Sequence, residues 1–374
     1  MNLAGIRFDF YQLIGIINSK ISRKTDKYYD IVIVRVDAIG DYVIWRDSLS
    51  AYKSKYHDKE VLLICADIVK PLAENESFFT DIVTFNRKRV ERDMIYLLSI
   101  QNKLLSIRAG IVINPSWQRH RISDFFTKSI KATEKIAYRG AGTDGFVRRY
   151  YNGVYTTLID NPNTHSEITA TEYFTKTVIS PEFKYGYSKL ESSESCIPVD
   201  GNYIVVAIST SNDIRSWEVE KFAEVIETIP PNYSVVLCGA GKGDLERGNA
   251  IISIVGGNRI ILNYINRTSL QQLVSVISHS SLVVGNDSSA VHIAAACHIP
   301  SICIAPGAHL GRFVPYPNYL PYNQYSPRVV NHSLGCDGCG YNCIRPVHDT
   351  LECVKRIEVA DVQRELNILL QELN

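Results

Sequence analysis

The feature that most limits the fold of this chain is a series of short β-branched runs, separated by segments long enough for a helix. The first four runs are Ile31–Val36, Val61–Cys65, Ile82–Phe85 and Ile111–Asn114. They are continuously apolar, which predicts strands covered on both faces, as in a parallel sheet with crossovers. The helix expected after the first strand carries an apolar stripe formed by Trp45, Leu49, Tyr52 and Tyr56. The first half therefore predicts a doubly wound α/β domain.

A second series of apolar runs begins after a polar segment at residues 180–202, which contains Pro181, Gly186, Pro198 and Gly201. Loop-forming residues at this density mark a boundary between domains. The runs beyond it are Tyr203–Ile208, Ser234–Cys238, Arg259–Leu262, Leu282–Gly285 and Ser301–Ala305. Thr268 and Gln271 are expected to form a capping box ahead of one intervening helix. The second half therefore repeats the architecture of the first.

These two series set the expected domain limits, and a length of 374 residues suits two domains. We expect a helical extension at 1–28, a first domain at 29–190, a second at 200–357 and a C-terminal helix at 358–374. The last helix has apolar residues at helical spacing, namely Val359, Val362, Leu366, Leu369 and Leu373. Because parallel sheets bind ligands at the carboxyl ends of their strands, we expect the chemistry in a cleft between the domains.

Charge and hydropathy exclude some classes of protein. The 40 basic and 39 acidic residues give a formal charge of +1, too little for the basic field of a nucleic-acid binder. The sequence has no run of apolar residues long enough for a membrane span, and Arg7 and Asp9 interrupt what would be a secretory signal. We therefore expect a cytoplasmic protein. Residues 1–24 fit either a helix packed on the first domain or peripheral contact with the inner membrane surface.

One strand-to-helix turn in the first half carries a candidate catalytic carboxylate. In the segment 35–41, Gly40 is expected to permit a tight turn and Asp41 to lie at the start of the next helix. A carboxylate in this place faces the cleft. The alternative is a capping role, since aspartate near a helix N-terminus accepts backbone N–H bonds.

Two segments of the second half suit a phosphate-bearing ligand. At 285–292, Ser288 and Ser289 offer hydroxyl and N–H donors at a helix N-terminus, where the helix dipole favours a diphosphate. The alternatives there are Asp287 as N-cap and His292 as a buried structural histidine. At 208–217, Arg215 can hold phosphate oxygens bidentately. The alternative is a solvated loop in which this arginine makes a salt bridge.

Taken together in this order, these segments resemble glycosyltransferase family 9, which includes the lipopolysaccharide heptosyltransferases. The resemblance spans residues 31–370 and rests on the stretches 31–41, 215–223, 266–270, 284–296 and 306–307. The Gly40-Asp41 turn alone is a weak signal. The run Asp287-Ser-Ser-x-x-His-x-Ala-Ala is the more specific one.

The resemblance implies two Rossmann-like domains facing a cleft (the GT-B type), with the donor nucleotide on the second domain and the acceptor on the first. It also implies that the last helix crosses back to the first domain. Asp41 matches the general base, Arg215 the contact to donor phosphate and Asp287 the contact near the donor sugar. The other donor-binding residues that we expect are Ser209, Thr210, Gly239, Ser288, Ser289 and His292. On the acceptor side we expect Asp37, Gly40, Arg119 and Arg121.

Some residues depart from the family pattern. Asp37 stands where relatives more often carry a small hydroxyl residue, and Arg215 stands where lysine is also common. Ser289-Ala290 replaces the more usual step that contains a glycine. The donor sugar therefore need not be heptose.

Four of the nine cysteines, Cys336, Cys339, Cys343 and Cys353, are crowded into eighteen residues. Four thiols at such spacing could hold a tetrahedral structural zinc. The other interpretations are packing thiols without a metal and a disulfide pair, which a reducing cytoplasm disfavours.

The sequence thus predicts an inverting glycosyltransferase that needs no metal. It would move heptose or a similar sugar from a nucleotide-diphosphate sugar, with an ADP-sugar favoured, to a glycan or lipid-linked glycan acceptor in lipopolysaccharide or surface-polysaccharide assembly. The alternatives from other classes are a non-catalytic nucleotide-sugar-binding protein and a nucleotide-sugar epimerase. Nucleic acid is not an expected partner.

Overall fold

A computed structural model describes residues 27–140, 150–186 and 188–373 of the chain. The chain folds into two compact units. Unit 1 contains the chain up to Thr164 together with Thr169–Lys184, and unit 2 contains His165–Ile168 and the chain from Tyr185 onward. The N-terminal extension expected at 1–28 lies almost wholly outside the described residues. No described helix has the length and apolarity that crossing a membrane requires.

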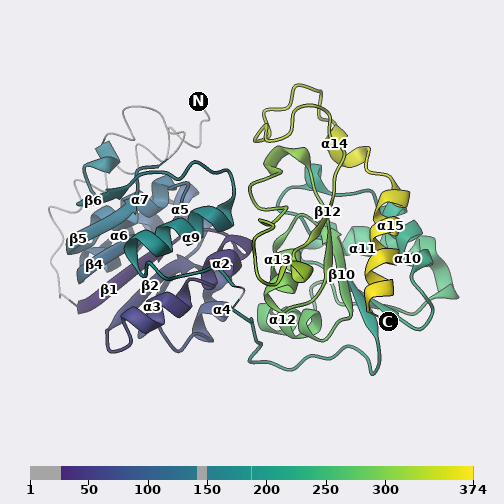
Figure 1. The fold of residues 1–374 in the computed structure, drawn as a ribbon, viewed down its shortest axis with the longest axis horizontal. Coiled ribbons are helices and arrows are strands. Elements are labelled where there is room, and N and C mark those ends of the chain that lie inside the picture. The colour runs from purple at the N-terminus through teal and green to yellow at the C-terminus, as the bar shows by residue number, and fades with distance from the viewer. Residues whose placement is uncertain (1–26, 141–149, 187, 374) are drawn as a thin grey trace. The chain divides into compact units, whose positions relative to one another are not determined.

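Unit 1 is built on a parallel six-stranded sheet with the strand order β3-β2-β1-β4-β5-β6 (Figure 1). Its strands are β1 (Lys27–Arg35), β2 (Val61–Ala66), β3 (Asp81–Phe85), β4 (Ile107–Asn114), β5 (Lys131–Tyr138) and β6 (Thr157–Ile159). The four strands expected from continuous apolar runs are all present. The sequence did not predict β5, whose first half has no fully buried residue, or β6, which has three residues.

The helices of unit 1 connect these strands as crossovers, except for the last helix, which follows β6. They are α2 (Ile39–Arg46), α3 (Leu49–Lys55), α4 (Lys70–Glu74), α5 (Arg87–Arg92), α6 (Met94–Leu105), α7 (Arg121–Ser129) and α9 (Glu167–Val178), with the 3₁₀ turn η1 (Asp67–Val69). The apolar stripe after β1 is divided between α2 and α3. Trp45 and Tyr52, which lie on different helices, are buried and in edge contact with ring centroids 5.8 Å apart.

Unit 2 repeats this plan with a second parallel sheet, in which β10 and β12 are labelled in Figure 1. The strand order of this sheet is β12-β11-β10-β7-β8-β9. Its strands are β7 (Tyr203–Ala207), β8 (Ser234–Cys238), β9 (Ile261–Asn263), β10 (Leu282–Asn286), β11 (Ser301–Ile304) and β12 (Arg328–Val330). The expected strands agree with β7 to β11 within about two residues. β12 was not predicted, because it is a three-residue strand in a segment rich in Pro, Tyr and Asn.

The helices of unit 2 are α10 (Val219–Thr228), α11 (Lys242–Val255), α12 (Leu270–Ser278), α13 (Ser289–Ala296), α14 (Glu352–Lys355) and α15 (Val359–Glu372). Short 3₁₀ turns are η2 (Asp213–Arg215), η3 (Gly256–Asn258), η4 (Gly307–His309) and η5 (Asn323–Tyr325). The capping box of α12 lies one residue later than expected. Ser269 Oγ accepts from Gln272 N (3.1 Å) and Gln272 Oε1 accepts from Ser269 N (3.0 Å), while Gln271 is buried.

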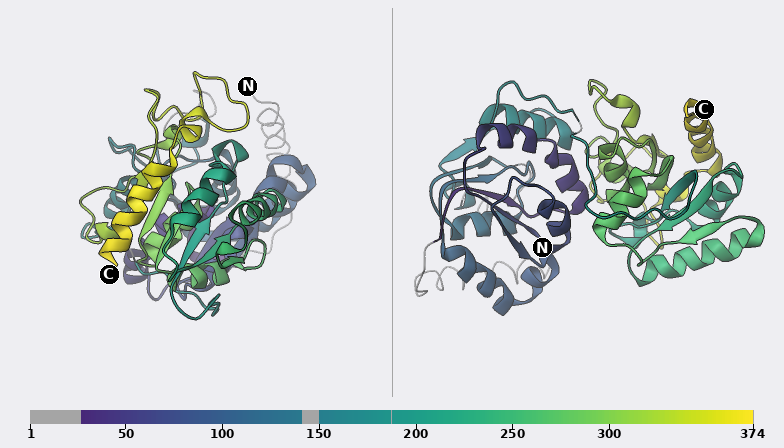
Figure 2. Two further views of the ribbon diagram at one scale, coloured as in Figure 1. Left: turned by 90° about the vertical axis from the view of Figure 1, so that its right-hand side faces the viewer. Right: turned by 90° about the horizontal axis from the view of Figure 1, so that it is seen from below.

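The last helix corrects one expectation. The resemblance implied that it crosses back to the first domain, but α15 packs within unit 2 against α10, β11 and β12 (Figure 2). The physical reason is its apolar face. Val362, Leu366 and Leu369 are buried in one core cluster with residues of α10 and of the sheet. Each fully buried side chain of this size contributes about 1.5–3 kcal/mol, so the stripe fixes the helix where it lies.

Candidate active site

The candidate donor site of unit 2 lies at the carboxyl edge of its sheet, where the chain leaves β7 and β10. A Cβ at Gly285 would lie 2.7 Å from the carbonyl oxygen of Ala207, so a glycine is needed for this close approach of the two strands. Asn286 then links the two strand ends. Its Nδ2 donates to Ile208 O (2.8 Å) and its Oδ1 accepts from Trp217 N (3.1 Å). The segments after β7 and β10 are therefore held side by side.

An ion pair joins two of the predicted donor residues across these segments. Arg215 Nη2 donates to the carboxylate of Asp287 (2.5 Å) and to its backbone oxygen (2.9 Å). Arg215 Nη1 donates to Ser211 Oγ (2.7 Å). The side chains of Arg215 and Asp287 are only 13% and 8% exposed, so solvent screens this pair weakly. The salt bridge that the sequence offered as an alternative for Arg215 is present, and its partner is the other predicted site residue.

Polar atoms without a partner accumulate next to this pair. Ser288 is the N-cap of α13, but its hydroxyl makes no capping bond. Its Oγ and the Nε of Arg215 are buried without a hydrogen-bond partner among the described residues. Asp287, considered as the cap from the sequence, instead pairs with Arg215. Two unused donors at a helix N-terminus suit an anionic ligand with several acceptor oxygens.

His292 lies one turn into α13 and is buried. Its Nδ1 is 2.7 Å from Tyr316 Oη, and the two rings are stacked with centroids 5.9 Å apart. Burial lowers the pKa of His292 to about 4; the negative charge of Asp287 opposes this shift and the positive charge of Arg215 adds to it. The imidazole is therefore neutral at neutral pH, and its position fits the structural alternative.

Two other donor candidates, Ser209 and Gly239, adjoin a residue that the sequence did not single out, Asp244 in the first turn of α11. Its buried carboxylate accepts from Ser209 Oγ, Ala240 N (2.9 Å) and Arg247 Nη2 (2.5 Å). A Cβ at Gly239 would lie 3.0 Å from the Cβ of Asp244. The N-terminus of α11 is thus occupied by the protein's own carboxylate, unlike that of α13. Thr210 Oγ1 donates to the backbone oxygen of Asn212 (2.9 Å).

In unit 1, the turn after β1 is organised by Arg35, which the sequence did not single out either. This side chain is buried and donates from Nη2 to the backbone oxygen of Asp41 (3.0 Å) and from Nη1 to Ser116 Oγ (3.2 Å). Its Nε lies 3.1 Å from the carboxylate of Asp37, which also accepts from Ser116 Oγ (3.0 Å). The turn is therefore fixed by one buried guanidinium.

Asp41 lies in the first turn of α2, where its Oδ2 accepts a long bond from Ala38 N (3.3 Å). The residue remains partly exposed, so the two roles considered from the sequence are compatible. Gly40 is also in α2 and is not among the described glycines with positive φ. The tight turn expected of it is therefore wrong, because the backbone there is helical.

The two acceptor-side arginines differ in their surroundings. Arg119 is buried and donates to Tyr138 O (2.9 Å) and Asn152 Oδ1 (2.8 Å). Arg121 opens α7 and is half-buried. Between them His120 caps α7, and burial lowers its pKa to about 4, with Arg87 adding to the shift and Asp37 opposing it. His120 is a further polar residue near Asp37 that the sequence did not single out.

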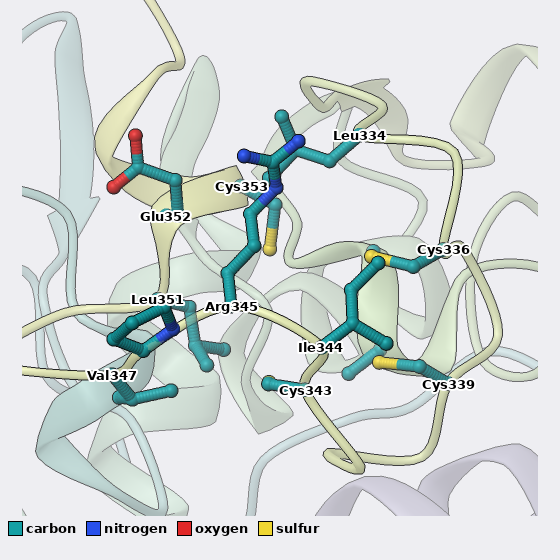
Figure 3. A pocket seen from close by; sticks show the side chains of 13 residues that line it. Leu334, Cys336, Cys339, Cys343, Ile344, Arg345, Val347, Leu351, Glu352 and Cys353 are labelled. Atoms are coloured by element: carbon teal, nitrogen blue, oxygen red, sulfur yellow. The ribbon is translucent and has the colours of Figure 1, made fainter.

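The four crowded cysteines line one cavity of about 20 Å³ at the segment that follows β12 (Figure 3). All are free thiols, so the disulfide interpretation is wrong. The cavity has room for about one atom or water molecule, and four thiolates are a donor set that zinc and iron accept. Among the described residues, however, no group of three or more Cys, His, Asp or Glu side chains is gathered closely enough to hold a metal ion. Thiolates are ligands that these metals accept, but the four described thiols are not gathered closely enough to bind one.

Comparisons with known proteins agree with this fold. The family model described as glycosyltransferase family 9 (heptosyltransferase) matches residues 104–324. Lipopolysaccharide heptosyltransferase 3 of Escherichia coli K12 is 24% identical over 267 residues, which are 69% of this chain and 76% of the relative.

Solved structures are similar across almost the whole chain. The E. coli heptosyltransferase WaaC with ADP-2-deoxy-2-fluoro heptose has a TM-score of 0.67 at 13% identity, covering 91% of this chain and 99% of that one. TibC, described as a dodecameric iron-containing heptosyltransferase in complex with ADP-D-β-D-heptose, has a TM-score of 0.52 at 16% identity, covering 94% of this chain and 79% of that one. The fold is of the GT-B type, with two Rossmann-like domains. The chain belongs to glycosyltransferase family 9 and is a glycosyltransferase.

Proposed function

We propose that this protein transfers heptose or a similar sugar from a nucleotide-diphosphate sugar, with an ADP-sugar favoured, to a lipopolysaccharide or surface-polysaccharide acceptor. The observation that carries this proposal is the Arg215–Asp287 pair with the unused donors Arg215 Nε and Ser288 Oγ beside it. The ADP-sugar preference rests on the related proteins crystallised with ADP-heptose compounds. The nine free cysteines favour a reducing compartment, which for this chain would be the cytoplasm.

The proposed chemistry is a single displacement with inversion at the anomeric carbon. Asp41 of unit 1 takes the proton of the acceptor hydroxyl as its oxygen forms the new bond to that carbon. The bond from the anomeric carbon to the diphosphate breaks, and the leaving group carries the electron pair. Arg215 and the amides of Ser288 and Ser289 stabilise the charge that develops on the diphosphate. Because these groups are cationic or N–H donors, transfer does not require a divalent metal.

The remaining predicted residues keep the roles expected from the family. In this proposal Asp287 contacts the donor near its sugar, and His292 lies within α13, the helix whose N-terminus receives the diphosphate. Ser209, Thr210 and Gly239 shape the same edge of the sheet. Asp37, Gly40, Arg119 and Arg121 belong to the acceptor side; for Arg119, which is buried, this role is indirect.

The proposed donor site predicts a selective thermal response. At a concentration one hundred times its Kd, ADP should raise the stability of the wild-type protein by about 2.7 kcal/mol. UDP, GDP and CDP should shift the melting temperature less, as measured by differential scanning fluorimetry. Arg364→Ala, which removes an exposed arginine of unit 2, is the matched control and should respond as the wild type does. A chain that responds equally to all four nucleotides, or to none, contradicts the ADP preference.

A second prediction concerns metals. Prolonged dialysis against EDTA should leave the initial rate of sugar transfer unchanged, since Arg215 and backbone amides take the place of a divalent ion at the diphosphate. Elemental analysis of the same samples decides the state of the cysteine cluster. One zinc or iron per chain, lost in Cys339→Ser, supports a structural metal; no metal with four reactive thiols supports packing thiols. A transfer rate that falls on dialysis and returns with Mg²⁺ contradicts metal-independent transfer.

A further inference from the structure

The segment that carries the cysteines folds back onto the donor side of unit 2. We call residues 336–343 the thiol loop. Gly338 N donates to Gly307 O (2.7 Å) and Gly340 N donates to Ala308 O (2.9 Å), so the loop pairs with the chain that leaves β11. A Cβ at Gly307 would meet Oδ1 of Asp337, so the Asp337 side chain would have to move to admit a larger residue. The pairing fixes where the loop lies relative to the end of the sheet.

Tyr341 is the residue that this loop presents to the donor site. The centre of its ring lies 5.7 Å from the guanidinium carbon of Arg215, within the range of a cation–π contact. Its ring also packs against that of His309, with centroids 4.7 Å apart and an edge-on geometry. Tyr341, Arg215 and Asp287 thus form one cluster, although Tyr341 is separated from the other two by long stretches of sequence.

The conformation of Tyr341 is unfavourable in two independent ways. Its φ is +68°, in the left-handed region that disfavours a residue with a bulky side chain. Its hydroxyl is buried without a hydrogen-bond partner among the described residues. Tyr42 and Tyr52 also have buried hydroxyls without a partner, but neither has positive φ. Strain and an unsatisfied polar group at one residue are typical of a functional site.

The hydroxyl of Tyr341 is the third buried polar group beside the Arg215–Asp287 pair that lacks a hydrogen-bond partner among the described residues. Within the described part of the chain, Arg215 Nε, Ser288 Oγ and Tyr341 Oη are all buried without a partner, and all belong to residues that form, contact or adjoin the Arg215–Asp287 pair. A tyrosine hydroxyl is protonated at neutral pH, so it can donate a hydrogen bond as the other two groups can. Three donors that lack acceptors around one ion pair match a ligand with many charged acceptor oxygens.

We propose that Tyr341 is a donor-binding residue, whose hydroxyl donates a hydrogen bond to the diphosphate of the nucleotide sugar while its ring holds the guanidinium of Arg215 in place. This inference rests on the proposed donor site. It assigns the thiol loop a role in that site, namely to hold a tyrosine in a conformation that becomes favourable when the ligand supplies the acceptor.

The test is Tyr341→Phe, which removes the hydroxyl and keeps the ring. We expect the Kd for ADP to rise by about tenfold, the value of one charge-assisted hydrogen bond, by isothermal titration calorimetry. The melting temperature of the unliganded variant should be equal to or higher than that of the wild type, because a buried hydroxyl without a partner is removed. Tyr341→Leu, which also removes the ring, should weaken ADP binding further. Tyr322→Phe, at an exposed tyrosine of unit 2, is the control.

The outcomes separate this inference from the proposed function. If the wild type binds ADP and Tyr341→Phe binds it equally well, Tyr341 is not a donor-binding residue and the proposed function stands. If Tyr341→Phe loses both affinity and melting temperature, the hydroxyl has a structural partner and the inference is overturned. If the wild type itself does not bind ADP, the proposed ADP-sugar donor fails first.

Discussion

Replacing Asp41 by asparagine should lower the rate of sugar transfer by about 10²- to 10⁴-fold, the usual contribution of a general base. An amide cannot take the proton of the acceptor hydroxyl. It still offers an oxygen to Ala38 N, the hydrogen bond that Asp41 makes in the first turn of α2. The helix should therefore form normally in the variant. The expected measurement is kcat from the release of ADP, with the thermal response to ADP as a check that the donor site is intact.

Two comparisons make this experiment decisive. Asp58→Asn removes an exposed carboxylate of the same unit and should leave the transfer rate unchanged. Asp37→Asn removes a carboxylate that pairs with Arg35, so it should disturb the turn and lower the melting temperature, which Asp41→Asn should not do. A fully active Asp41→Asn protein removes Asp41 from the mechanism. A variant that loses both transfer and ADP binding indicates a structural role instead.

The sequence predicted those parts of the fold that local composition determines. Strands such as β2 and β10 are buried along their whole length, so they appear as continuous apolar runs. The strand β5 is buried only in its second half and does not stand out from its neighbours. Helix α15 was predicted as an amphipathic helix. An apolar stripe does not specify which surface it covers, and the surface proved to be that of unit 2.

The candidate site likewise contains residues that the sequence predicted and residues that it did not. Arg215, Asp287 and Ser288 could be predicted because the ends of parallel strands meet at one edge of the sheet, and the structure brings them together there. Arg35, Asp244 and Tyr341 could not, because their importance depends on contacts between distant parts of the chain. Tyr341 lies in a loop whose sequence gives no indication that it returns to Arg215. The cysteines were predicted to lie together, which is so, but spacing alone could not show how their side chains are arranged around the cavity.

The electrostatics of unit 2 explain why the diphosphate is expected at α13 and not at α11. Both helices begin at the carboxyl edge of the sheet. The N-terminal region of α11 already receives the carboxylate of Asp244, which Ala240 N and Arg247 satisfy. At α13 the cap hydroxyl of Ser288 has no hydrogen-bond partner among the described residues, whereas each of the two neighbouring arginines, Arg215 and Arg247, has a buried Nε without one. A dianionic group therefore gains more at α13, because Ser288 leaves its hydroxyl unused there and the nearby carboxylate of Asp287 is already paired with Arg215.

If the diphosphate binds at α13, replacing the neighbouring Arg215 should also have a large effect on sugar transfer. Arg215→Ala should lower kcat by about 10²- to 10³-fold, the usual cost of removing one donor that stabilises developing charge. It also leaves the carboxylate of Asp287 buried without its cation, which costs about 3–5 kcal/mol of stability. Arg215→Lys should avoid this loss of stability, because the ammonium group of lysine can still pair with the carboxylate of Asp287. Lysine lacks the planar fork, so its transfer rate should lie between those of the wild type and the alanine variant.

The role of Arg215 is tested by ranking the wild type, Arg215→Lys and Arg215→Ala by transfer rate, ADP affinity and melting temperature. If charge alone matters, Arg215→Lys should transfer sugar at the wild-type rate. If the bidentate fork matters, the lysine variant should bind ADP more weakly and transfer more slowly while melting at nearly the wild-type temperature. An alanine variant that melts much earlier but retains full kcat and ADP affinity would mean that the Arg215–Asp287 pair stabilises the fold only.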